Sequence, residues 1–286
     1  MKKIRVGING FGRIGRAFLR VAHKNPEIEV VAVNDLGDVH NLAYLLQYDT
    51  VYRNPGFSVA VSADAKSILV DGAPLTFLQE KDPTLLPWKA LDIDVVVEST
   101  GLFATYEKSQ AHIQAGAKKV VISAPAKGDT GSAQGETILM SVNEEKFGTC
   151  DITSNASCTT NAASPLIAIL DEALGVEKAI LNTVHGYTAS QGIVDGPNKK
   201  DFREGRAAAM NIVPSSTGAA IAVTKAFPKL EGLFDGISIR VPVVAGSIVD
   251  ITFIAKRDTT KEEVNAILGE AAKGEKWNRV FSVTHD

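Results

Sequence analysis

The start of this 286-residue chain constrains its fold more than any other stretch. Residues 4–8 form a short apolar strand candidate, and residues 10–15 then read Gly-Phe-Gly-Arg-Ile-Gly. Apolar residues at helical spacing follow at once: Ile14, Ala17, Phe18 and Val21. A strand, a glycine-rich turn and a helix in this order predict a parallel α/β unit with a phosphate-binding turn.

A second buried strand over residues 30–33 ends beside Asp35, which lies 20 residues after Gly15. In such a unit Gly10 and Gly12 let the backbone approach a pyrophosphate, and the acidic residue accepts hydrogen bonds from a ribose. The alternative is a tight turn with a capping aspartate and no ligand. A carboxylate at Asp35 would also repel a 2′-phosphate, which favours NAD over NADP.

Three further patterns complete the first half of the chain. Residues 67–75 centre on Asp71-Gly72 and predict a β-hairpin. Residues 94–98 and 120–122 contain apolar runs that are followed by small polar residues. Because ligands bind at the carboxyl ends of the strands in a doubly wound sheet, we expect these ends to face the cofactor. Ordinary strand-end turns are the alternative.

The second half opens on SNASCTTN, residues 154–161, which surrounds Cys158 with small polar residues. A helical pattern runs from residue 159 to 174, with Ser157 as its predicted N-cap. Cys158 would then lie at a helix N-terminus, where the helix dipole favours a thiolate. Pro165 either kinks this helix or delays its start.

A nucleophilic cysteine needs a base, and His185 is the best candidate because it follows a strand-like run. The alternative is a buried structural cysteine. The same half of the chain supplies residues that can bind anions through hydroxyls, a backbone N–H or guanidinium groups: Ser157, Thr159, Thr188, Arg203, Thr217, Gly218 and Arg240. Each arginine alone fits a solvated surface charge, but the alternating pattern of residues 236–241 favours a structured position for Arg240.

The tail has an alternating strand over residues 247–256 and a helix that starts with a capping box, Thr260-x-x-Glu263. One face of the strand and one stripe of the helix are apolar: Val249, Ile251, Phe253, Ala255, Val264, Ile267, Leu268 and Ala271. The predicted fold class is therefore α/β. A Rossmann-type doubly wound, mostly parallel sheet is expected over residues 1–157, joined to an α+β domain with a largely antiparallel sheet over residues 158–286.

Composition argues against several other classes of protein. The net charge of −3 provides no basic field for nucleic acid. Because no run of about 18 apolar residues occurs, no membrane span is expected, and the first residues lack the apolar core of a signal peptide. Two cysteines cannot form a disulfide framework, so a reducing, cytoplasmic setting is expected. Without CxxC or HExxH patterns, no metal site is predicted.

Nine segments stand out when the chain is considered as a whole: GINGFGRIGR, VVAVNDL, YLLQYDT, VVESTG, KKVVISAP, SNASCTTN, TVHGYTASQ, NIVPSSTGAA and RVPVVAGSIVD. From residue 2 to about residue 280, the sequence resembles the phosphorylating glyceraldehyde-3-phosphate dehydrogenases. The resemblance implies that glyceraldehyde 3-phosphate, NAD and inorganic phosphate react to give 1,3-bisphosphoglycerate and NADH. It also implies a homotetramer, in which a loop at residues 188–206 reaches a neighbouring subunit's cofactor.

By motif position, the resemblance implies roles for individual residues. Cys158 would attack the aldehyde to form a thiohemiacetal, and His185 would promote the thiolate and take the hydroxyl proton as hydride leaves for NAD. Thr188 and Arg240 would hold the substrate phosphate. The positions expected at the attacking phosphate are Ser157, Thr159, Arg203, Thr217 and Gly218. Those expected at the cofactor are Gly10, Gly12, Arg13, Ile14, Gly15, Asp35, Ser123 and Lys81, the last where many members have an arginine.

The resemblance also implies a longer chain, because typical members continue for roughly fifty residues beyond the position of Asp286. We therefore expect this chain to lack the segment whose asparagine orients the nicotinamide, either as an incomplete coding sequence or as a natural short form. A non-catalytic nucleotide-binding protein is one alternative, and an erythrose-4-phosphate dehydrogenase is another. A semialdehyde dehydrogenase of the aspartate pathway is disfavoured by TVHGYT and SSTGAA.

Overall fold

The structure, a computed structural model, describes residues 2–126, 135–199 and 201–284. The chain divides into two compact units. The first unit comprises Met1–Glu136 and Phe147–Asn155, and the second comprises Thr137–Lys146 and Ala156–Asp286.

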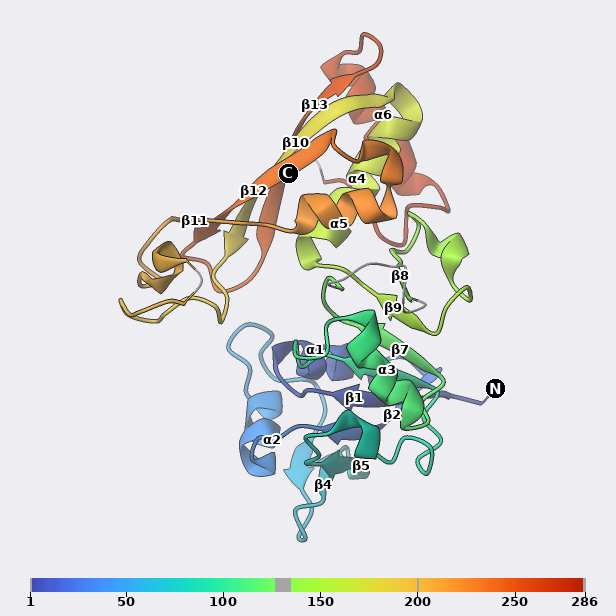
Figure 1. Cartoon of the computed structure of the whole chain (residues 1–286), viewed down its shortest axis with the longest axis vertical. Coiled ribbons are helices and arrows are strands. Elements are labelled where there is room, and N and C mark those ends of the chain that lie inside the picture. Colours follow the sequence, from blue (N-terminus) through green and yellow to red (C-terminus); the bar gives the residue numbers. More distant parts are fainter. Residues whose placement is uncertain (1, 127–134, 200, 285–286) are drawn as a thin grey trace. The chain divides into compact units, whose positions relative to one another are not determined.

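The first unit is built on a sheet with the strand order β3-β4-β5-β2-β1-β6-β7-β9-β8. Figure 1 labels most of these strands. Its strands are β1 (Ile4–Asn9), β2 (Ile28–Asn34), β3 (Val59–Val61), β4 (Ser67–Val70), β5 (Ala73–Leu78), β6 (Val95–Glu98), β7 (Lys119–Ile122), β8 (Gly135–Thr137) and β9 (Ile152–Ser154). The pairings from β5 through β2, β1, β6 and β7 to β9 are all parallel. The order runs outward from β1 in both directions, so the predicted doubly wound sheet is confirmed.

Both faces of this sheet are covered, as its uninterrupted apolar strands require. Successive side chains on a strand point to opposite faces, and Ala32 and Val33 on β2 accordingly belong to two different hydrophobic clusters. The cluster of Val33 includes residues of α1 (Arg13–Ala22) and α2 (Val39–Gln47). The cluster of Ala32 includes Tyr106 of α3 (Tyr106–Gln114).

Helix α1 has the predicted position, but the face it buries differs from the predicted apolar stripe. Ile14 is 55% exposed and Val21 is 71% exposed, whereas the buried residues are Gly15, Arg16, Leu19 and Ala22. The cause is the close approach of the helix to the glycine turn. A Cβ added to Gly15 would lie 2.2 Å from the Gly10 carbonyl oxygen, so this side of the helix must face the turn.

The predicted hairpin around Asp71-Gly72 is confirmed by the antiparallel pair β4–β5. Asp71 has φ 49° and Gly72 has φ 80°. Two consecutive residues with positive φ are the signature of a type I′ turn, whose twist matches that of the flanking strands.

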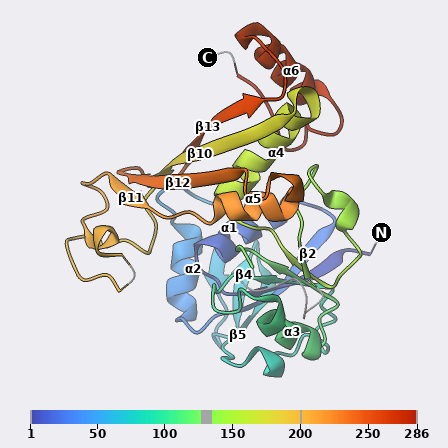
Figure 2. The ribbon, with the colours of Figure 1, turned by 45° about the horizontal axis from the view of Figure 1, so that its top comes forward.

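The second unit contains a four-stranded sheet with the order β11-β12-β10-β13. Its strands are β10 (Val176–Gly186), β11 (Val213–Ser215), β12 (Phe234–Val241) and β13 (Ser247–Ala255). The β11–β12 and β10–β13 pairs are antiparallel and the β10–β12 pair is parallel, in keeping with a largely antiparallel sheet. The helices are α4 (Cys158–Leu174), α5 (Ala219–Ala226) and α6 (Lys261–Lys273) (Figure 2).

These helices pack on one face of the sheet, and β13 shows the alternation that this arrangement requires. Its partly buried residues join the hydrophobic cluster of α4, α5 and α6: Val249, Ile251, Phe253 and Ala255. The intervening Ile248 and Ile254 are exposed. At the start of α6, Thr260 accepts a hydrogen bond from the Glu263 backbone N–H, which is one half of the predicted capping box. The Glu263 carboxylate accepts from Thr259 Oγ1 at 2.7 Å and from Arg257 Nη2 at 2.8 Å.

Within the described ranges, no helix combines the length and apolar character needed to cross a membrane. In those same ranges, no group of three or more His, Cys, Asp or Glu side chains is placed to hold a metal ion. Both cysteines are free: Cys150 is buried and Cys158 is exposed.

Candidate active site

Cys158 is the first residue of α4. The Ser157 side chain caps this helix, because its Oγ accepts a hydrogen bond from the Thr160 N–H at 3.0 Å. Both features follow the sequence prediction. The helix starts before Pro165 and includes it, so of the two alternatives left open for Pro165 the later start is wrong. The sulfur therefore lies where unpaired backbone N–H groups and the helix dipole favour a negative charge.

The backbone just before the cysteine is strained. Ala156 is buried and has φ 54°, in the left-handed region that residues with a Cβ rarely adopt. Strain of this kind costs on the order of 1–3 kcal/mol and persists where the surrounding structure holds it. Ala156 belongs to a small hydrophobic cluster with Leu139 and Ala222. The turn that delivers Cys158 to the helix start is thus held by packing.

The exposed Cys158 thiol contacts His185, which lies near the carboxyl end of β10 and is half-buried. The distance from Cys158 Sγ to His185 Nε2 is 3.3 Å. A nucleophile and a base within hydrogen-bond reach are the minimal apparatus for covalent catalysis.

The other ring nitrogen of His185 has two neighbours. Nδ1 lies 2.7 Å from the Gly186 carbonyl oxygen and 2.7 Å from Nη1 of Arg240. A carbonyl only accepts hydrogen bonds and a guanidinium only donates them, so the two contacts demand opposite protonation of Nδ1. The partner that holds Nδ1 decides whether the proton of a neutral ring is at Nε2, beside the sulfur.

Arg240 reaches His185 because β10 and β12 run in parallel with these two residues directly opposite each other. Its Nε is buried and has no hydrogen-bond partner among the described residues. A guanidinium with unused donors beside a nucleophile is suited to an anionic ligand. The structure therefore brings Cys158, His185 and Arg240 together at one point.

Two of the remaining anion-binding candidates make hydrogen bonds through their hydroxyl groups. Thr188 Oγ1 lies 3.0 Å from Ser190 Oγ, and Thr217 Oγ1 accepts a bond from the Ala219 N–H at 3.1 Å. Thr159 is buried in the first turn of α4. Gly218 is the N-cap of α5 and has open space at its Cα. In the described part of the chain, no hydrogen bond joins these four residues to Cys158 or His185.

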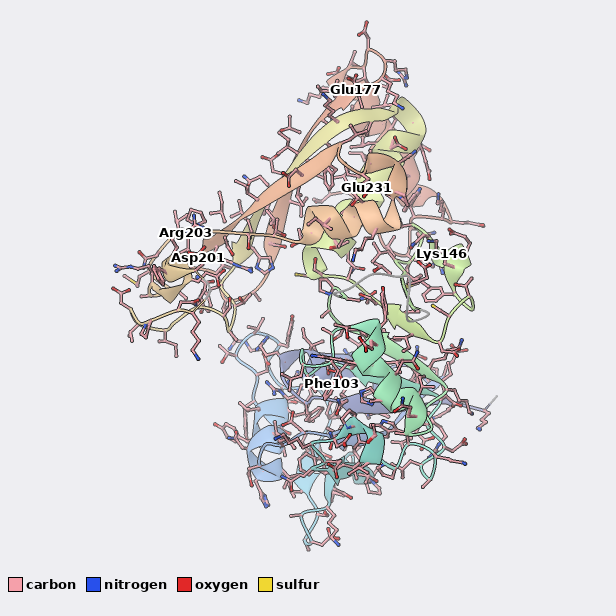
Figure 3. The ribbon with its side chains drawn as sticks, in the orientation of Figure 1. Phe103, Lys146, Glu177, Asp201, Arg203 and Glu231 are labelled. Carbon is pink, nitrogen blue, oxygen red and sulfur yellow. The ribbon has the colours of Figure 1, made fainter. Side chains whose placement is uncertain are left out.

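Arg203 is paired with a carboxylate. It lies in a short 3-10 helix, Phe202–Gly205, and its Nη2 is 2.7 Å from Asp201 Oδ2, with both side chains labelled in Figure 3. The hydrogen bond from Arg203 holds the pKa of Asp201 below its usual range, and the same bond raises the pKa of Arg203. A phosphate that binds Arg203 must therefore displace Asp201 or share the guanidinium with it.

The first unit has a pocket of about 310 Å³ at the carboxyl ends of β1, β2 and β6. Four of the predicted cofactor residues line it: Gly10, Gly12, Asp35 and Lys81. The Asp35 carboxylate accepts hydrogen bonds from the Phe11 N–H at 2.6 Å and the Gly37 N–H at 2.8 Å. Backbone amides thus fix an acceptor where a ribose is expected.

The other predicted cofactor residues lie outside the lining of this pocket. Arg13 forms an ion pair with Asp49 at 3.3 Å, and Ile14 is exposed. Gly15 packs against the glycine turn, and Ser123 donates a hydrogen bond to the Glu98 carbonyl.

Sequence reasoning missed several residues of the pocket wall. Asn9, Asn34 and Phe103 line it. The two asparagines end β1 and β2, so a polar residue that closes a buried strand was the available signal.

Arg16 supports the glycine turn. It is buried, and its guanidinium donates a 2.8 Å hydrogen bond to the Phe11 carbonyl. Its pKa is lowered chiefly by burial.

A dinucleotide-type sheet and a cysteine–histidine pair in one chain define a class: nucleotide-dependent oxidoreductases that act through a cysteine nucleophile. Comparisons with known proteins identify the family within that class. Residues 4–106 match the model described as "Glyceraldehyde 3-phosphate dehydrogenase, NAD binding domain", and residues 157–286 match "Glyceraldehyde 3-phosphate dehydrogenase, C-terminal domain". The chain belongs to the glyceraldehyde-3-phosphate dehydrogenase family.

Similar proteins carry the same name. The chain is 48% identical over 272 residues to glyceraldehyde-3-phosphate dehydrogenase B of Aspergillus oryzae, covering 95% of this chain and 79% of the relative. It is 47% identical over 274 residues to glyceraldehyde-3-phosphate dehydrogenase 1 of Bacillus subtilis, with the same coverages. It is 46% identical over 286 residues to glyceraldehyde-3-phosphate dehydrogenase 3 of Saccharomyces cerevisiae, covering 99% of this chain and 83% of the relative.

Proposed function

We propose that this chain catalyses the NAD-dependent oxidative phosphorylation of glyceraldehyde 3-phosphate to 1,3-bisphosphoglycerate. The observation that carries the proposal is the 3.3 Å contact between Cys158 Sγ and His185 Nε2, with the exposed sulfur at the start of α4. Bound NAD supplies the hydride acceptor. Family membership supports NAD as the cofactor, and the pocket around Asp35 fits its adenosine ribose.

The reaction begins at the sulfur of Cys158. The thiolate attacks the aldehyde carbon, and the new oxyanion takes a proton to give a thiohemiacetal. His185 then accepts the hydroxyl proton as hydride leaves the same carbon, which yields a thioester on Cys158. Inorganic phosphate attacks the thioester carbon, and the carbon–sulfur bond breaks to release the acyl phosphate and regenerate the thiolate. The helix start favours the thiolate at both ends of this cycle.

His185 accepts the proton through Nε2, and it can do so only when the proton of the neutral ring is on Nδ1. When Nδ1–H donates to the Gly186 carbonyl, Nε2 is free to take a proton. When Arg240 donates to Nδ1, the proton of a neutral ring must sit on Nε2. A substrate phosphate that draws Arg240 away therefore favours the form of His185 that acts as a base.

Two groups of residues hold the phosphates in this proposal. Arg240 and Thr188 bind the phosphate of the aldehyde, which places the carbonyl carbon beside Cys158. The attacking phosphate is held by Ser157, Thr159, Arg203, Thr217 and Gly218. At the cofactor, the proposed residues are Gly10, Gly12, Arg13, Ile14, Gly15, Asp35, Lys81 and Ser123. Residues 1–157 act as the NAD-binding domain, and residues 158–286 act as the catalytic domain.

We also propose that the protein is a cytoplasmic homotetramer. Large apolar side chains are exposed between β10 and β11, which supports burial against another subunit. They are Ile193, Val194, Phe202, Met210 and Ile212. Light scattering should give a mass near four times the 30.4 kDa of the chain. A monomeric mass would contradict the assembly and leave the proposed chemistry standing.

The direct test of the function is NADH formation by the purified chain. We expect turnover of glyceraldehyde 3-phosphate that requires both NAD and inorganic phosphate, and slower turnover of erythrose 4-phosphate. Faster turnover of erythrose 4-phosphate would instead favour that substrate. Binding of NAD with no NADH formed from either aldehyde would contradict the proposal and favour a non-catalytic nucleotide-binding protein.

A further inference from the structure

A chain of buried polar side chains lies beside the pocket of the first unit. It runs from Trp88 through His112, Glu98 and Asn9 to Asn34. None of the five residues is more than 5% exposed. Burial of a charged carboxylate with its polar neighbours is costly unless every group is hydrogen-bonded. The pattern of donors and acceptors therefore shows which groups carry the protons.

All the donors around Glu98 point at its carboxylate. Oε2 accepts from Asn9 Nδ2 at 2.6 Å and lies 3.1 Å from His112 Nε2. Oε1 accepts from the Thr100 N–H at 2.8 Å and from Thr100 Oγ1 at 2.5 Å. Four donors match the four lone-pair positions of a carboxylate, so Glu98 fits this environment as an anion.

The hydrogen bond from Trp88 determines the tautomer of His112. The indole Nε1 lies 3.1 Å from His112 Nδ1, and an indole N–H only donates. Nδ1 must therefore be the bare nitrogen, which places the proton on Nε2, where it donates to Glu98. An imidazolium would present a second N–H to Trp88 and lose this bond. Asn9 Nδ2 also lies 3.4 Å from His112 Nε2, but it makes the much shorter 2.6 Å bond to Glu98 Oε2, so both groups donate to the carboxylate. The shortest contact of each His112 nitrogen thus agrees with a neutral ring that carries its proton on Nε2.

The network fixes residues that line the pocket. Asn9 donates to Glu98 and accepts from Asn34 Nδ2 at 2.7 Å, which sets the orientation of its amide. Asn9, Asn34 and Thr100 all line the pocket. So does Phe103, labelled in Figure 3, whose ring meets that of His112 edge-on at 6.2 Å between centroids.

We propose that Trp88, His112 and Glu98 are positioning residues for NAD. Together they hold Asn9 and Thr100 at the carboxyl ends of β1 and β6, where the cofactor binds. None of the three needs to touch NAD, because they act through the two residues that line the pocket. This inference rests on the proposed use of NAD by the chain.

The test compares the effect on NAD affinity with the effect on stability. His112→Phe keeps an aromatic ring but removes both ring nitrogens, so Trp88 loses its acceptor and Glu98 loses a donor. We expect the Kd for NAD to rise about tenfold. Ile93→Ala is the matched control, because Ile93 is 1% exposed and belongs to the same hydrophobic cluster as Trp88. It should lower the Tm at least as much as His112→Phe while changing the Kd less than twofold.

Two further measurements separate positioning from packing. His112→Gln retains one acceptor and one donor, so it should recover at least half of the lost affinity. In the wild type, long-range ¹H–¹⁵N spectra should show a proton on Nε2 of His112 and none on Nδ1. Trp88→Phe should release this preference and raise the Kd about threefold.

The proposal is overturned if His112→Phe and Ile93→Ala weaken NAD binding in the same proportion to their loss of Tm. A proton on Nδ1 of wild-type His112 would overturn it as well. Failure of the function itself would look different, because wild-type protein would then form no NADH whatever the state of His112. Alkylation of Cys158 by iodoacetamide in the absence of NAD should be unchanged in His112→Phe, which shows that the second unit is intact.

Discussion

His112 and His185 each present an Nε2 atom to a partner side chain, and the two rings differ in burial and in the partners of Nδ1. His112 is completely buried, and the shortest contacts of its two nitrogens, to Trp88 and to Glu98, agree with a single tautomer. His185 is half-buried, and its Nδ1 lies equally close to Gly186 and Arg240, which demand different tautomers. One ring is fixed by its hydrogen bonds, and the other is left undecided.

The difference separates a ring that positions its neighbours from one that can transfer a proton. A histidine that holds other groups gains from a single protonation state, because each change of state would break a buried hydrogen bond. A general base must change state in every turnover, so a second partner for Nδ1 is useful when ligand binding selects between the two. Burial alone would not distinguish these roles, whereas the identity of the partners does.

The largest expected loss of activity follows substitution of Cys158, the partner of His185. Cys158→Ser should lower NADH formation on the order of 10⁴-fold or more, since a hydroxyl beside a histidine is a far weaker nucleophile than a thiolate. Cys150→Ser is the control, because Cys150 is buried and its Sγ bonds to the Ile152 carbonyl at 3.3 Å. Initial rates with saturating substrates give the comparison. Full activity in Cys158→Ser would remove Cys158 as the nucleophile.

The next effect contrasts the two histidines directly. His185→Asn should slow NADH formation in the first turnover by about 10²–10⁴-fold, because the base is lost. His112→Asn should leave the first turnover at saturating NAD within about twofold, because it acts on cofactor affinity. Stopped-flow absorbance measures both. Equal losses in the two variants would mean that the contrast between them does not reflect function.

The fold was predictable because its determinants are local in the sequence. The glycine turn between β1 and α1, the Asp71-Gly72 hairpin and the alternation of β13 each follow from a short pattern with a direct physical cause. The rotation of α1 was not predictable from its apolar stripe. It depends on the close packing of Gly15 against the glycine turn, where an added Cβ would lie 2.2 Å from the Gly10 carbonyl oxygen, and the apolar periodicity does not reveal this contact.

The candidate site was predictable where residues act through their own chemistry. Polar surroundings pointed to Cys158, a preceding strand-like run to His185 and an alternating pattern to Arg240, and the structure shows their contacts. Residues that act through others were missed. His112 reads as one polar residue on a polar helix, and only the packing of α3 on the sheet brings its side chain to Glu98 of β6. Hydrogen-bond direction in such a network is a property of the folded chain.

A third effect tests the partner that competes for Nδ1 of His185. Arg240→Gln should raise the KM for glyceraldehyde 3-phosphate by about 10–100-fold, because a charge-assisted bond to the substrate phosphate is lost. Unphosphorylated glyceraldehyde is the control substrate. If its turnover changes as well, Arg240 acts on His185 directly through the 2.7 Å contact to Nδ1. If neither substrate responds, Arg240 has no part in the site.

The smallest effect is expected at Arg203, where Asp201 and the attacking phosphate compete for the same guanidinium group. Asp201→Asn should lower the KM for inorganic phosphate about two- to threefold, because exposed ion pairs are weak and Arg203 would be freed from one. The low pKa of Asp201, set mainly by the bond from Arg203, keeps the carboxylate charged at neutral pH. The difference in phosphate KM between wild type and variant should therefore be largest at neutral pH. It should shrink only when acidification reaches the low pKa of Asp201, because protonation of the carboxylate then weakens the ion pair in the wild type as well.

Asp195→Asn is the matched control for Asp201→Asn. Asp195 pairs with Arg206 at 3.1 Å in the same segment and also accepts a backbone N–H, as Asp201 does. Its substitution removes the same charge and should leave the phosphate KM unchanged. Equal shifts in both variants would indicate a general effect of negative charge on anion binding. A higher KM in Asp201→Asn would mean that Asp201 does not compete with phosphate but positions Arg203 for it, as Glu98 is proposed to position Asn9 and Thr100.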